Sequence, residues 1–371
     1  MSVIMSVMGF FGLVSPSVPE GAKTDYTQCK NVIYLIGDGM GFNSLEKTRF
    51  DCNVTLDGFD AFPYKGEALT HSANDEVTDS AAGGTALATA SKTNNDFIGV
   101  YPYDGFNINS HPLNLTELAI SMGKAAGVVT TDKTSGATPA AFSAHTHSRG
   151  DEAKITKQQL AGDLTLCWGS ATESFTTAKA TANGFVTITD KTSMEALEEG
   201  SRSFGQFTES TWHNYENKGM PTLTQMTEKA IDLLDDDEDG FFLMVEAAHI
   251  DKNSHSNDGA GMVDAVQSFN NVLTYCLEYA KENGDTFVVV TADHETGGIT
   301  FTGDEYIYTK TSHSSANVPV LAYGCDDFME NGEVMENTEV ARRVACIMGD
   351  TNFPGKTTTI DSLINGKNDV C

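Results

Sequence analysis

Several short apolar runs along the chain end at polar residues, the pattern expected of buried strands in a parallel sheet. Residues 31–36 are apolar and β-branched and lead into a Gly-Asp-Gly turn. Residues 286–291 repeat the pattern before Asp293, and residues 241–245 end at Glu246. Runs this short and this apolar fit strands covered on both faces. Two further strands are predicted at 128–131 and 318–323.

Between these runs the apolar residues follow a helical period. From Val266 to Ala280 they recur in steps of three and four, and Asn283-Gly284 ends the pattern. The alanine-rich residues 79–90 predict a helix that begins near Ser80. The alternation of strands and helices predicts an α/β fold, a single large domain with a mostly parallel central sheet and helices on both faces. Two more helices are predicted at 116–126 and 339–348.

The ends and the middle of the chain fit this domain less closely. Residues 1–22 start with an apolar stretch that lacks a preceding Lys or Arg, so we interpret them as a signal remnant or an N-terminal arm. The domain itself is assigned to residues 23–371. Residues 162–219 are rich in Thr, Ser and Gly, and we expect helices and loops there. No later stretch is long and apolar enough to span a membrane.

The charge balance limits the classes of molecule that the protein can bind. The 23 Lys and Arg against 52 Asp and Glu give a net charge of −29, which repels nucleic acid and anionic membranes. An anionic substrate would need local positive charge, such as metal ions. None of the seven cysteines forms a CxxC pair, so a thiolate zinc site is not expected. The cysteines fit either a few disulfides in an oxidising compartment or buried free thiols.

Metal-type side chains follow or end three of the predicted strands. Asp38 lies in the turn after the first strand, and Asp293-His294 place a carboxylate beside an imidazole. Because ligand sites of such sheets lie outside the carboxyl ends of the strands, we expect these groups at one rim. Gly-Asp-Gly is also a common turn, so Asp38 alone carries little weight.

The segment after residue 245 is dense in candidate ligands. Asp251 and His255 are four positions apart, so one helical turn puts them on the same face, where they can share a Zn²⁺. Glu246 is closer to the strand and would point elsewhere. For His249 we prefer a packed or surface role.

Ser80 and Arg149 are the candidates for chemistry on an anion. A helix that begins at Ser80 presents free N–H groups there, and a bound Zn²⁺ can stabilise the serine alkoxide. The alternative for Ser80 is a simple helix cap. Arg149 can hold two phosphate oxygens with its planar fork.

Taken together, these segments resemble the alkaline phosphatase family, and they occur in that family's order. The matching segments are 36–41, 77–82, 137–141, 147–149, 246–255, 291–294 and His313 before 318–320. The resemblance implies two Zn²⁺ and one Mg²⁺. The implied ligands are Asp251, His255 and His313 for the first zinc, Asp38, Asp293 and His294 for the second, and Asp38, Thr138 and Glu246 for the magnesium.

The resemblance also implies the reaction. Ser80 attacks the phosphorus of a phosphate monoester in line, Arg149 holds the non-bridging oxygens, and hydroxide then hydrolyses the phosphoserine to free phosphate. It further implies a secreted or periplasmic protein and a homodimer. His313 follows His294 by nineteen positions, too few for the crown-like insertion of some relatives, so any dimer interface is expected to be reduced.

One position departs from the family. Bacterial relatives often have a carboxylate two residues before the threonine ligand, paired with a lysine, whereas this chain has Gly136 there and keeps Lys252. We therefore expect Lys252 to lack its carboxylate partner, the surroundings of the magnesium to be looser, and phosphate release to be faster.

Two other functions are considered. One is a phosphodiesterase of the same superfamily, although such enzymes usually lack an arginine placed like Arg149. The other is a non-catalytic, metal-binding homologue, which would need neither Ser80 nor Arg149. A sulfatase is excluded because its Cys-x-Pro-x-Arg motif is absent.

Overall fold

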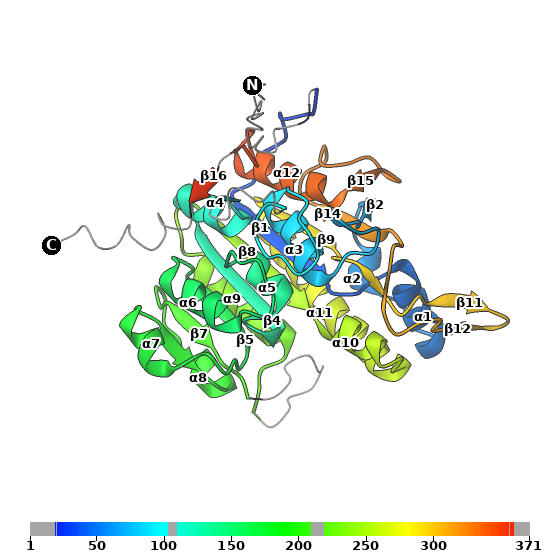
Figure 1. Ribbon diagram of the computed structural model, residues 1–371, viewed down its shortest axis with the longest axis horizontal. Coiled ribbons are helices and arrows are strands. Elements are labelled where there is room, and N and C mark those ends of the chain that lie inside the picture. The colour runs from blue at the N-terminus through cyan, green and yellow to red at the C-terminus, as the bar shows by residue number, and fades with distance from the viewer. Residues whose placement is uncertain (1–18, 20, 103–109, 209–218, 356, 360–371) are drawn as a thin grey trace, which may run out of the picture.

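The computed structural model describes residues 19, 21–102, 110–208, 219–355 and 357–359, and in them a ten-stranded sheet crosses the molecule (Figure 1). The sheet therefore extends well beyond the five strands that the sequence predicts. From one edge to the other the strands are β15 (Val334–Glu336), β2 (Tyr64–Leu69), β14 (Val318–Tyr323), β9 (Thr286–Thr291), β1 (Asn31–Gly37), β8 (Phe241–Ala247), β4 (Ala125–Lys133), β5 (Leu166–Ser170), β7 (Ser203–Gly205) and β6 (Val186–Ile188).

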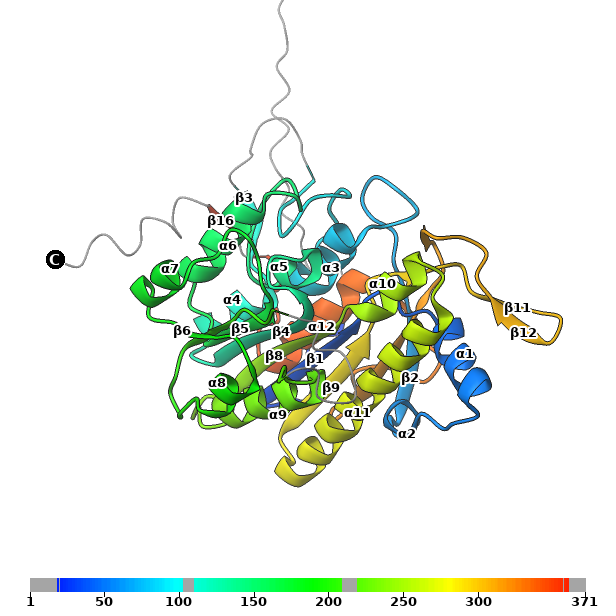
Figure 2. The same cartoon turned by 90° about the horizontal axis from the view of Figure 1, so that it is seen from below.

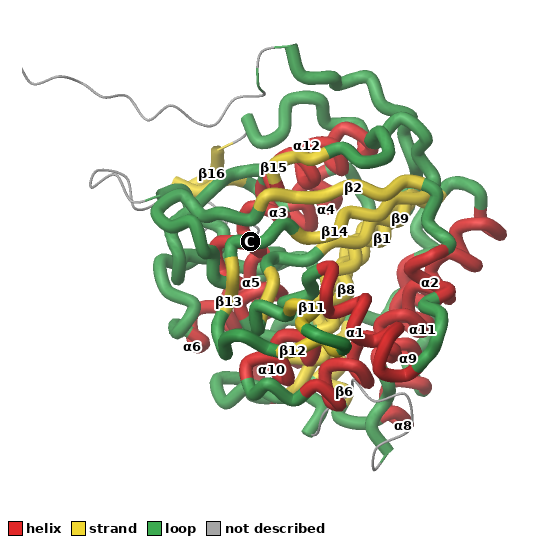
Figure 3. The backbone as a smooth tube through the Cα atoms, turned by 90° about the vertical axis from the view of Figure 1, so that its right-hand side faces the viewer, coloured by secondary structure: helices red, strands yellow, loops and turns green. Residues whose placement is uncertain are grey.

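The sheet is mostly parallel, as predicted. Every neighbouring pair is parallel except the two pairs made by β14, which runs antiparallel to both β9 and β2. Figure 3 shows β2, β14, β9 and β1 side by side as one layer. All residues of β1, β8 and β9 are buried, which explains why their sequences are almost uninterrupted apolar runs.

Helices cover both faces of the sheet, which confirms the second part of the prediction. Figure 2 shows α9 and α11 on one side of the strands and α3 and α5 on the other. The first face carries α9 (Leu223–Leu234) and α11 (Gly259–Asn283). The second carries α3 (Ser80–Thr89), α4 (Leu115–Ser121), α5 (Ala137–Ala141) and α12 (Asn337–Met348).

The remaining elements lie around these layers. The other helices are α1 (Phe42–Cys52), α2 (Asp57–Asp60), α6 (Glu152–Ala161), α7 (Thr177–Ala182), α8 (Lys191–Glu195) and α10 (His249–His255). Three small antiparallel ladders join β10 (Glu295–Thr296) to β13 (His313–Ser314), β11 (Thr300–Thr302) to β12 (Glu305–Ile307), and β3 (Ser110–Pro112) to β16 (Thr357–Thr359).

Helix α11 shows how directly the apolar pattern sets the packing. The predicted stripe from Val266 through Phe269 and Leu273 to Ala280 is buried against the sheet and neighbouring helices. The helix ends at Asn283, and Gly284 adopts φ +75°, the left-handed conformation that glycine adopts without steric cost. The structure adds about two turns at the start, where the Asp258 side chain accepts from the N–H of Gly261.

Three predictions about elements need correction. Residues 162–219 hold not only helices and loops but also β5, β7 and β6, which are too short to give a periodic signal. The helix predicted at 116–126 ends at Ser121, because Gly123 turns the chain with φ +86° into β4. Glu246 lies inside β8 rather than after it.

The cysteines, the search for membrane spans and the chain ends are considered within the described residues. Six cysteines there are free thiols, so the expected disulfides are not found among them, and Cys371 lies outside the described residues. Within the same ranges, no helix combines the length and apolar character needed to cross a membrane. Most of the 1–22 segment, residues 1–18 and 20, is also outside them. Between His294 and His313 the chain forms the short β11–β12 hairpin, seen projecting at one side in Figure 1.

Candidate active site

The carboxyl ends of the three central strands bring candidate ligands to one rim of the sheet. β1 pairs with both β8 and β9 in a register that sets Ile36 beside Glu246 and beside Thr291. Asp38 follows directly after β1, and Asp293 follows closely after β9. Because the three strands are parallel and hydrogen-bonded, these carboxylates lie at the same level of the sheet.

A glycine lets the turn after β1 approach the helix that carries Asp251. Gly39 has φ +73°, and a Cβ there would lie 2.7 Å from Cα of Asp251. Its N–H donates to Oδ1 of Asp293 at 3.2 Å. This one residue therefore allows the contact between the β1 turn, α10 and the segment after β9.

Asp251, His255 and His313 form the first group of ligand-type side chains. Asp251 and His255 are on α10, and His313 is on β13, which the ladder with β10 holds near the end of β9. Nε2 of His255 lies 3.3 Å from Oδ1 of Asp251 and 3.1 Å from Nε2 of His313. The three residues offer ligand atoms that all lie within 4.8 Å of one another.

Hydrogen bonds fix the tautomers of the two histidines in this group. Nδ1 of His255 donates to the carbonyl of Thr311 at 2.6 Å, and Nδ1 of His313 donates to the carbonyl of Thr78 at 2.9 Å. Both Nε2 lone pairs then face each other and the Asp251 carboxylate. Such a convergence of electron pairs is stable when a cation lies among them, and Nδ1 bonded to backbone carbonyls is the usual arrangement of metal-ligating histidines.

Asp38, Asp293 and His294 form the second group, and all three are buried. Nε2 of His294 lies 3.3 Å from Oδ2 of Asp293 and 3.6 Å from Oδ1 of Asp38. Burial, and then the charges of neighbouring carboxylates, raise the pKa of Asp38 well above its usual range. Burial and the nearby His313 lower the pKa of His294 to about 3, so its imidazole is neutral and can act as a ligand.

Three buried oxygen atoms of the candidate ligands have no hydrogen-bond partner among the described residues. They are Oδ1 of Asp38, Oδ2 of Asp293 and Oγ1 of Thr138. Thr138 is on α5, which packs against β4 and β8. Since leaving buried polar atoms unpaired is costly, these orphaned oxygens indicate that this part of the structure is built to hold cations.

Ser80 is the first residue of α3, and its hydroxyl is directed into the second group. The helix cap is Asp79, whose carboxylate accepts from the N–H of Ala82 at 2.9 Å, so Ser80 does not serve as the cap. The Ser80 hydroxyl donates to Nε2 of His294 at 3.1 Å. Because Thr296 Oγ1 donates to Asp251, it accepts from Nδ1–H of His294, which leaves Nε2 as the acceptor for Ser80.

Arg149 reaches the same region from the loop after α5. Its Nη1 lies 3.1 Å from Oδ2 of Asp79, the residue before the serine. Burial opposes the guanidinium charge, but the carboxylates of Asp79, Asp38 and Asp293 outweigh it and raise the pKa of Arg149. The side chain keeps 39% of its surface exposed, so the rest of the fork is accessible to an anion.

The end of β4 contributes residues that the sequence analysis did not single out. Thr130 donates from its hydroxyl to the buried carboxylate of Glu246, and Asp132 forms an ion pair with Lys252. Burial, followed by the charge of Asp132, raises the pKa of Glu246 to about 8. The available signal was that Asp132 comes directly after the predicted strand 128–131, as Asp38 follows shortly after its own predicted strand.

This ion pair contradicts the expectation about Lys252. The glycine at 136 does leave that position without a carboxylate. Lys252 is nevertheless paired, because the carboxylate of Asp132, four residues before Gly136, forms the ion pair instead. His249, for which a packed or surface role was predicted, is half-buried. Its Nδ1 lies 3.0 Å from Oγ1 of Thr131.

A third cluster has ligand-type residues but a different role. His111, Glu117 and His145 lie close together, with the two imidazole rings stacked at 3.6 Å. Both ring nitrogens of His145 face acceptors, the carbonyl of Gly99 at 2.5 Å and Oε1 of Glu117 at 2.9 Å. Burial opposes a charge on His145, but the Glu117 carboxylate outweighs it and raises the pKa of His145, which favours an ion pair that connects α4 to the loop after α5.

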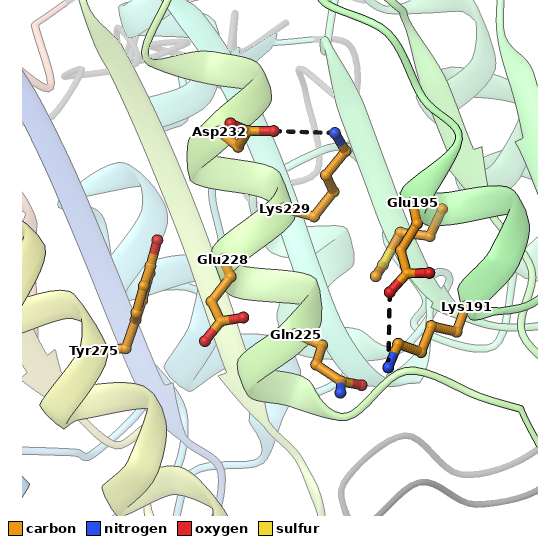
Figure 4. A pocket seen from close by; sticks show the side chains of 8 residues that line it. Lys191, Glu195, Gln225, Glu228, Lys229, Asp232 and Tyr275 are labelled. Atoms are coloured by element: carbon orange, nitrogen blue, oxygen red, sulfur yellow. Dashed lines mark hydrogen bonds and ion pairs between the residues drawn. The ribbon is translucent and has the colours of Figure 1, made fainter.

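A separate pocket of about 560 Å³ lies between α8, α9 and α11 (Figure 4). Its two lysines are already paired, Lys191 with Glu195 at 3.7 Å and Lys229 with Asp232 at 3.0 Å. Since these cations are neutralised by their own neighbours, the pocket offers little attraction to a phosphate group. The rim of the central strands is therefore the candidate active site.

Comparison with known proteins gives consistent matches. A family model described as alkaline phosphatase matches residues 29–180 and 175–312. Alkaline phosphatase of Escherichia coli is 32% identical over an alignment 333 residues long, and the match covers 71% of this chain and 70% of that protein. The solved alkaline phosphatase of the Antarctic bacterium TAB5 has a TM-score of 0.77 and 30% identity, and the match covers 87% of this chain and 99% of that one. A histidine-to-aspartate variant of the TAB5 enzyme, with Mg bound in its M3 site, matches with a TM-score of 0.76 and 28% identity over the same shares.

Proposed function

Because this chain belongs to the alkaline phosphatase family and is a phosphatase, we propose that it hydrolyses phosphate monoesters through a phosphoserine formed on Ser80. The observation that carries the proposal is the hydrogen bond between the Ser80 hydroxyl and His294, which sets the nucleophile beside a buried group of ligand-type side chains. Ser80 is also the first residue of α3, and Arg149 pairs with the adjacent Asp79.

The donor sets suit the metals that the family resemblance implies. Two groups with histidine nitrogens and carboxylate oxygens fit Zn²⁺, whereas Asp38, Thr138 and Glu246 offer only oxygen, which fits Mg²⁺. The magnesium structure of the TAB5 variant supports a third cation in this family. When bound, such cations stabilise charge on the attacking and leaving oxygens of an in-line displacement.

The protein's own residues would bind and orient the ester. The free N–H groups at the start of α3 and the guanidinium of Arg149 attract the phosphate oxygens. Asp79 fixes both, since it caps α3 and pairs with Arg149. The Ser80 oxygen forms the new bond to phosphorus as the alcohol leaves, and water then splits the phosphoserine to inorganic phosphate.

The test is hydrolysis of p-nitrophenyl phosphate at alkaline pH by the full chain. Ser80→Ala is expected to abolish turnover, with loss of the phosphorylated Ser80 peptide in acid-quenched samples. Ser121→Ala, at the far end of α4, is the matched control and should keep full activity. EDTA should remove the activity, and Zn²⁺ with Mg²⁺ should restore it. Full turnover by the Ser80→Ala protein would refute the proposal.

The same assay separates the alternatives. A phosphodiesterase would prefer bis-p-nitrophenyl phosphate over the monoester, and a non-catalytic homologue would bind zinc without hydrolysing either compound. Secretion or periplasmic location and a homodimer remain predictions. Cell fractionation and the mass of the protein in solution would test them.

A further inference from the structure

The ion pair between Asp132 and Lys252 lies beside the oxygen-rich side of the site. Asp132 is near the end of β4. Lys252 is on α10, between the candidate ligands Asp251 and His255. The side chains keep 25% and 44% of their surface exposed, and ion pairs with such exposure contribute little to stability. The pair therefore matters more for where it holds the ammonium group than for the free energy of unfolding.

The glycine at position 136 makes room for this carboxylate. The backbone of Gly136, with φ −55° and ψ 157°, is one that any residue adopts, so conformation does not require glycine. A Cβ there would lie 2.4 Å from Oδ2 of Asp132 and 3.0 Å from the carbonyl of Lys133, so a larger residue at this position would push the Asp132 carboxylate aside. The missing side chain at 136 and the carboxylate at 132 are thus complementary parts of one arrangement.

Asp132 is also connected to the ligand carboxylate Glu246. Its N–H donates to Oγ1 of Thr130 at 2.8 Å, and the Thr130 hydroxyl donates to Glu246. Lys252 directly follows the ligand residue Asp251 on α10, and its partner Asp132 is joined through Thr130 to Glu246, whose strand β8 pairs with β1 just before Asp38, so the ammonium group lies near the ligand carboxylates of Glu246 and Asp38. Lysine and a divalent cation are therefore alternative partners for the same two carboxylates.

We propose that Asp132 is a positioning residue that keeps the Lys252 ammonium away from Glu246 and Asp38, so that these carboxylates remain available to Mg²⁺. The inference rests on the proposed function, because it takes both carboxylates as magnesium ligands. Without its partner, the flexible lysine turns to the nearest remaining negative charges, where the attraction is strengthened by burial. The ammonium group then competes with the cation.

The test measures Mg²⁺ binding to the zinc-loaded full chain by titration calorimetry. Asp132→Asn keeps the shape of the side chain and removes its charge, and it is expected to raise the Kd for Mg²⁺ about 10-fold. Adding Lys252→Met to that variant should return the Kd to the wild-type value, whereas Lys252→Met alone should not weaken binding. A residue that only supported the fold would not give this rescue.

A second route to the same state avoids changing Asp132. Gly136→Ala displaces the Asp132 carboxylate, so it should weaken Mg²⁺ binding in the same direction, again with rescue by Lys252→Met. An unchanged Kd in Asp132→Asn, or a weakened Kd that Lys252→Met does not restore, overturns the inference. A wild-type protein that binds no Mg²⁺, or a Ser80→Ala protein with full turnover, overturns the proposed function instead.

Discussion

Oγ1 of Thr296 lies 2.5 Å from Oδ1 of Asp251 and thereby connects the two ligand groups of the site. The same hydroxyl accepts from Nδ1 of His294 at 3.2 Å. One buried side chain thus orients a carboxylate of the first group and an imidazole of the second. This contact constrains the position of the two ligand groups relative to each other.

Thr296→Val should loosen both groups at once. Valine has the same shape but neither donates to Asp251 nor accepts from His294, and loss of such supporting hydrogen bonds weakens metal binding by about 10- to 100-fold. Competition with a zinc chelator measures the change. Thr302→Val, on the exposed strand β11, is the matched control and should keep wild-type affinity. Equal zinc affinity in the two variants would show that Thr296 does not orient the ligands.

Arg149→Lys tests the use of the guanidinium fork. Lysine keeps the charge but cannot bond Asp79 and hold phosphate oxygens at the same time. A lost charge-assisted hydrogen bond of about 1.5–3 kcal/mol lowers kcat/KM by about 10- to 100-fold and raises the Ki of inorganic phosphate. Arg49→Lys, a surface residue paired with Glu46, serves as the control. A wild-type Ki for phosphate in Arg149→Lys would contradict a role in holding the oxygens.

Gly39→Ala should destabilise the protein both by backbone strain and by a steric clash with Asp251 on α10. A left-handed backbone costs a non-glycine residue about 1–2 kcal/mol, and overpacking against Asp251 adds roughly 1–3 kcal/mol. Gly303 also has a positive φ, +67°, but a Cβ there meets nothing within 4 Å. Urea unfolding should therefore show a larger loss for Gly39→Ala than for Gly303→Ala, with loss of bound zinc only in the former. Equal losses would mean that the close contact with α10 is unimportant.

Glu117→Gln tests the ion pair between Glu117 and the buried His145. The Glu117 carboxylate overcomes burial and raises the pKa of His145 above its ordinary value of 6.5. The folded protein then binds a proton more tightly than the unfolded chain, so this contribution is full below pH 6.5 and is lost as the pH rises through the raised value. Because Glu117 is partly exposed, we expect a loss of roughly 2 kcal/mol near pH 6.

The difference between wild type and Glu117→Gln should shrink in alkaline solution, measured by urea unfolding at a series of pH values. Glutamine can still accept at the start of α4, so the cap that Glu117 provides to Asn114 is preserved. Glu278→Gln, on the exposed side of α11, should show no such pH dependence. A difference for Glu117→Gln that stays constant up to high pH would mean that His145 is not the titrating partner.

Strong local signals account for the parts of the fold that were predicted correctly. The strands β1, β8 and β9 are buried on both faces, so their sequences are apolar throughout and stand out from the surrounding chain. Helix α11 is long enough for its period to be unmistakable. In contrast, β6 and β7 have three residues each and gain their hydrogen bonds from neighbours far along the chain, so no local pattern reveals them.

The sequence by itself determined the chemistry: the residue types, their placement at strand ends and helix starts, and the family to which the chain belongs. It also set the local conformations, because periodicity and glycine act over a few residues. Only the tertiary structure decided which side chains meet, such as Thr296 with Asp251 and Asp132 with Lys252. These pairs are separated by 45 and 120 positions, and nothing in the local pattern records a contact that strand register and helix packing bring about.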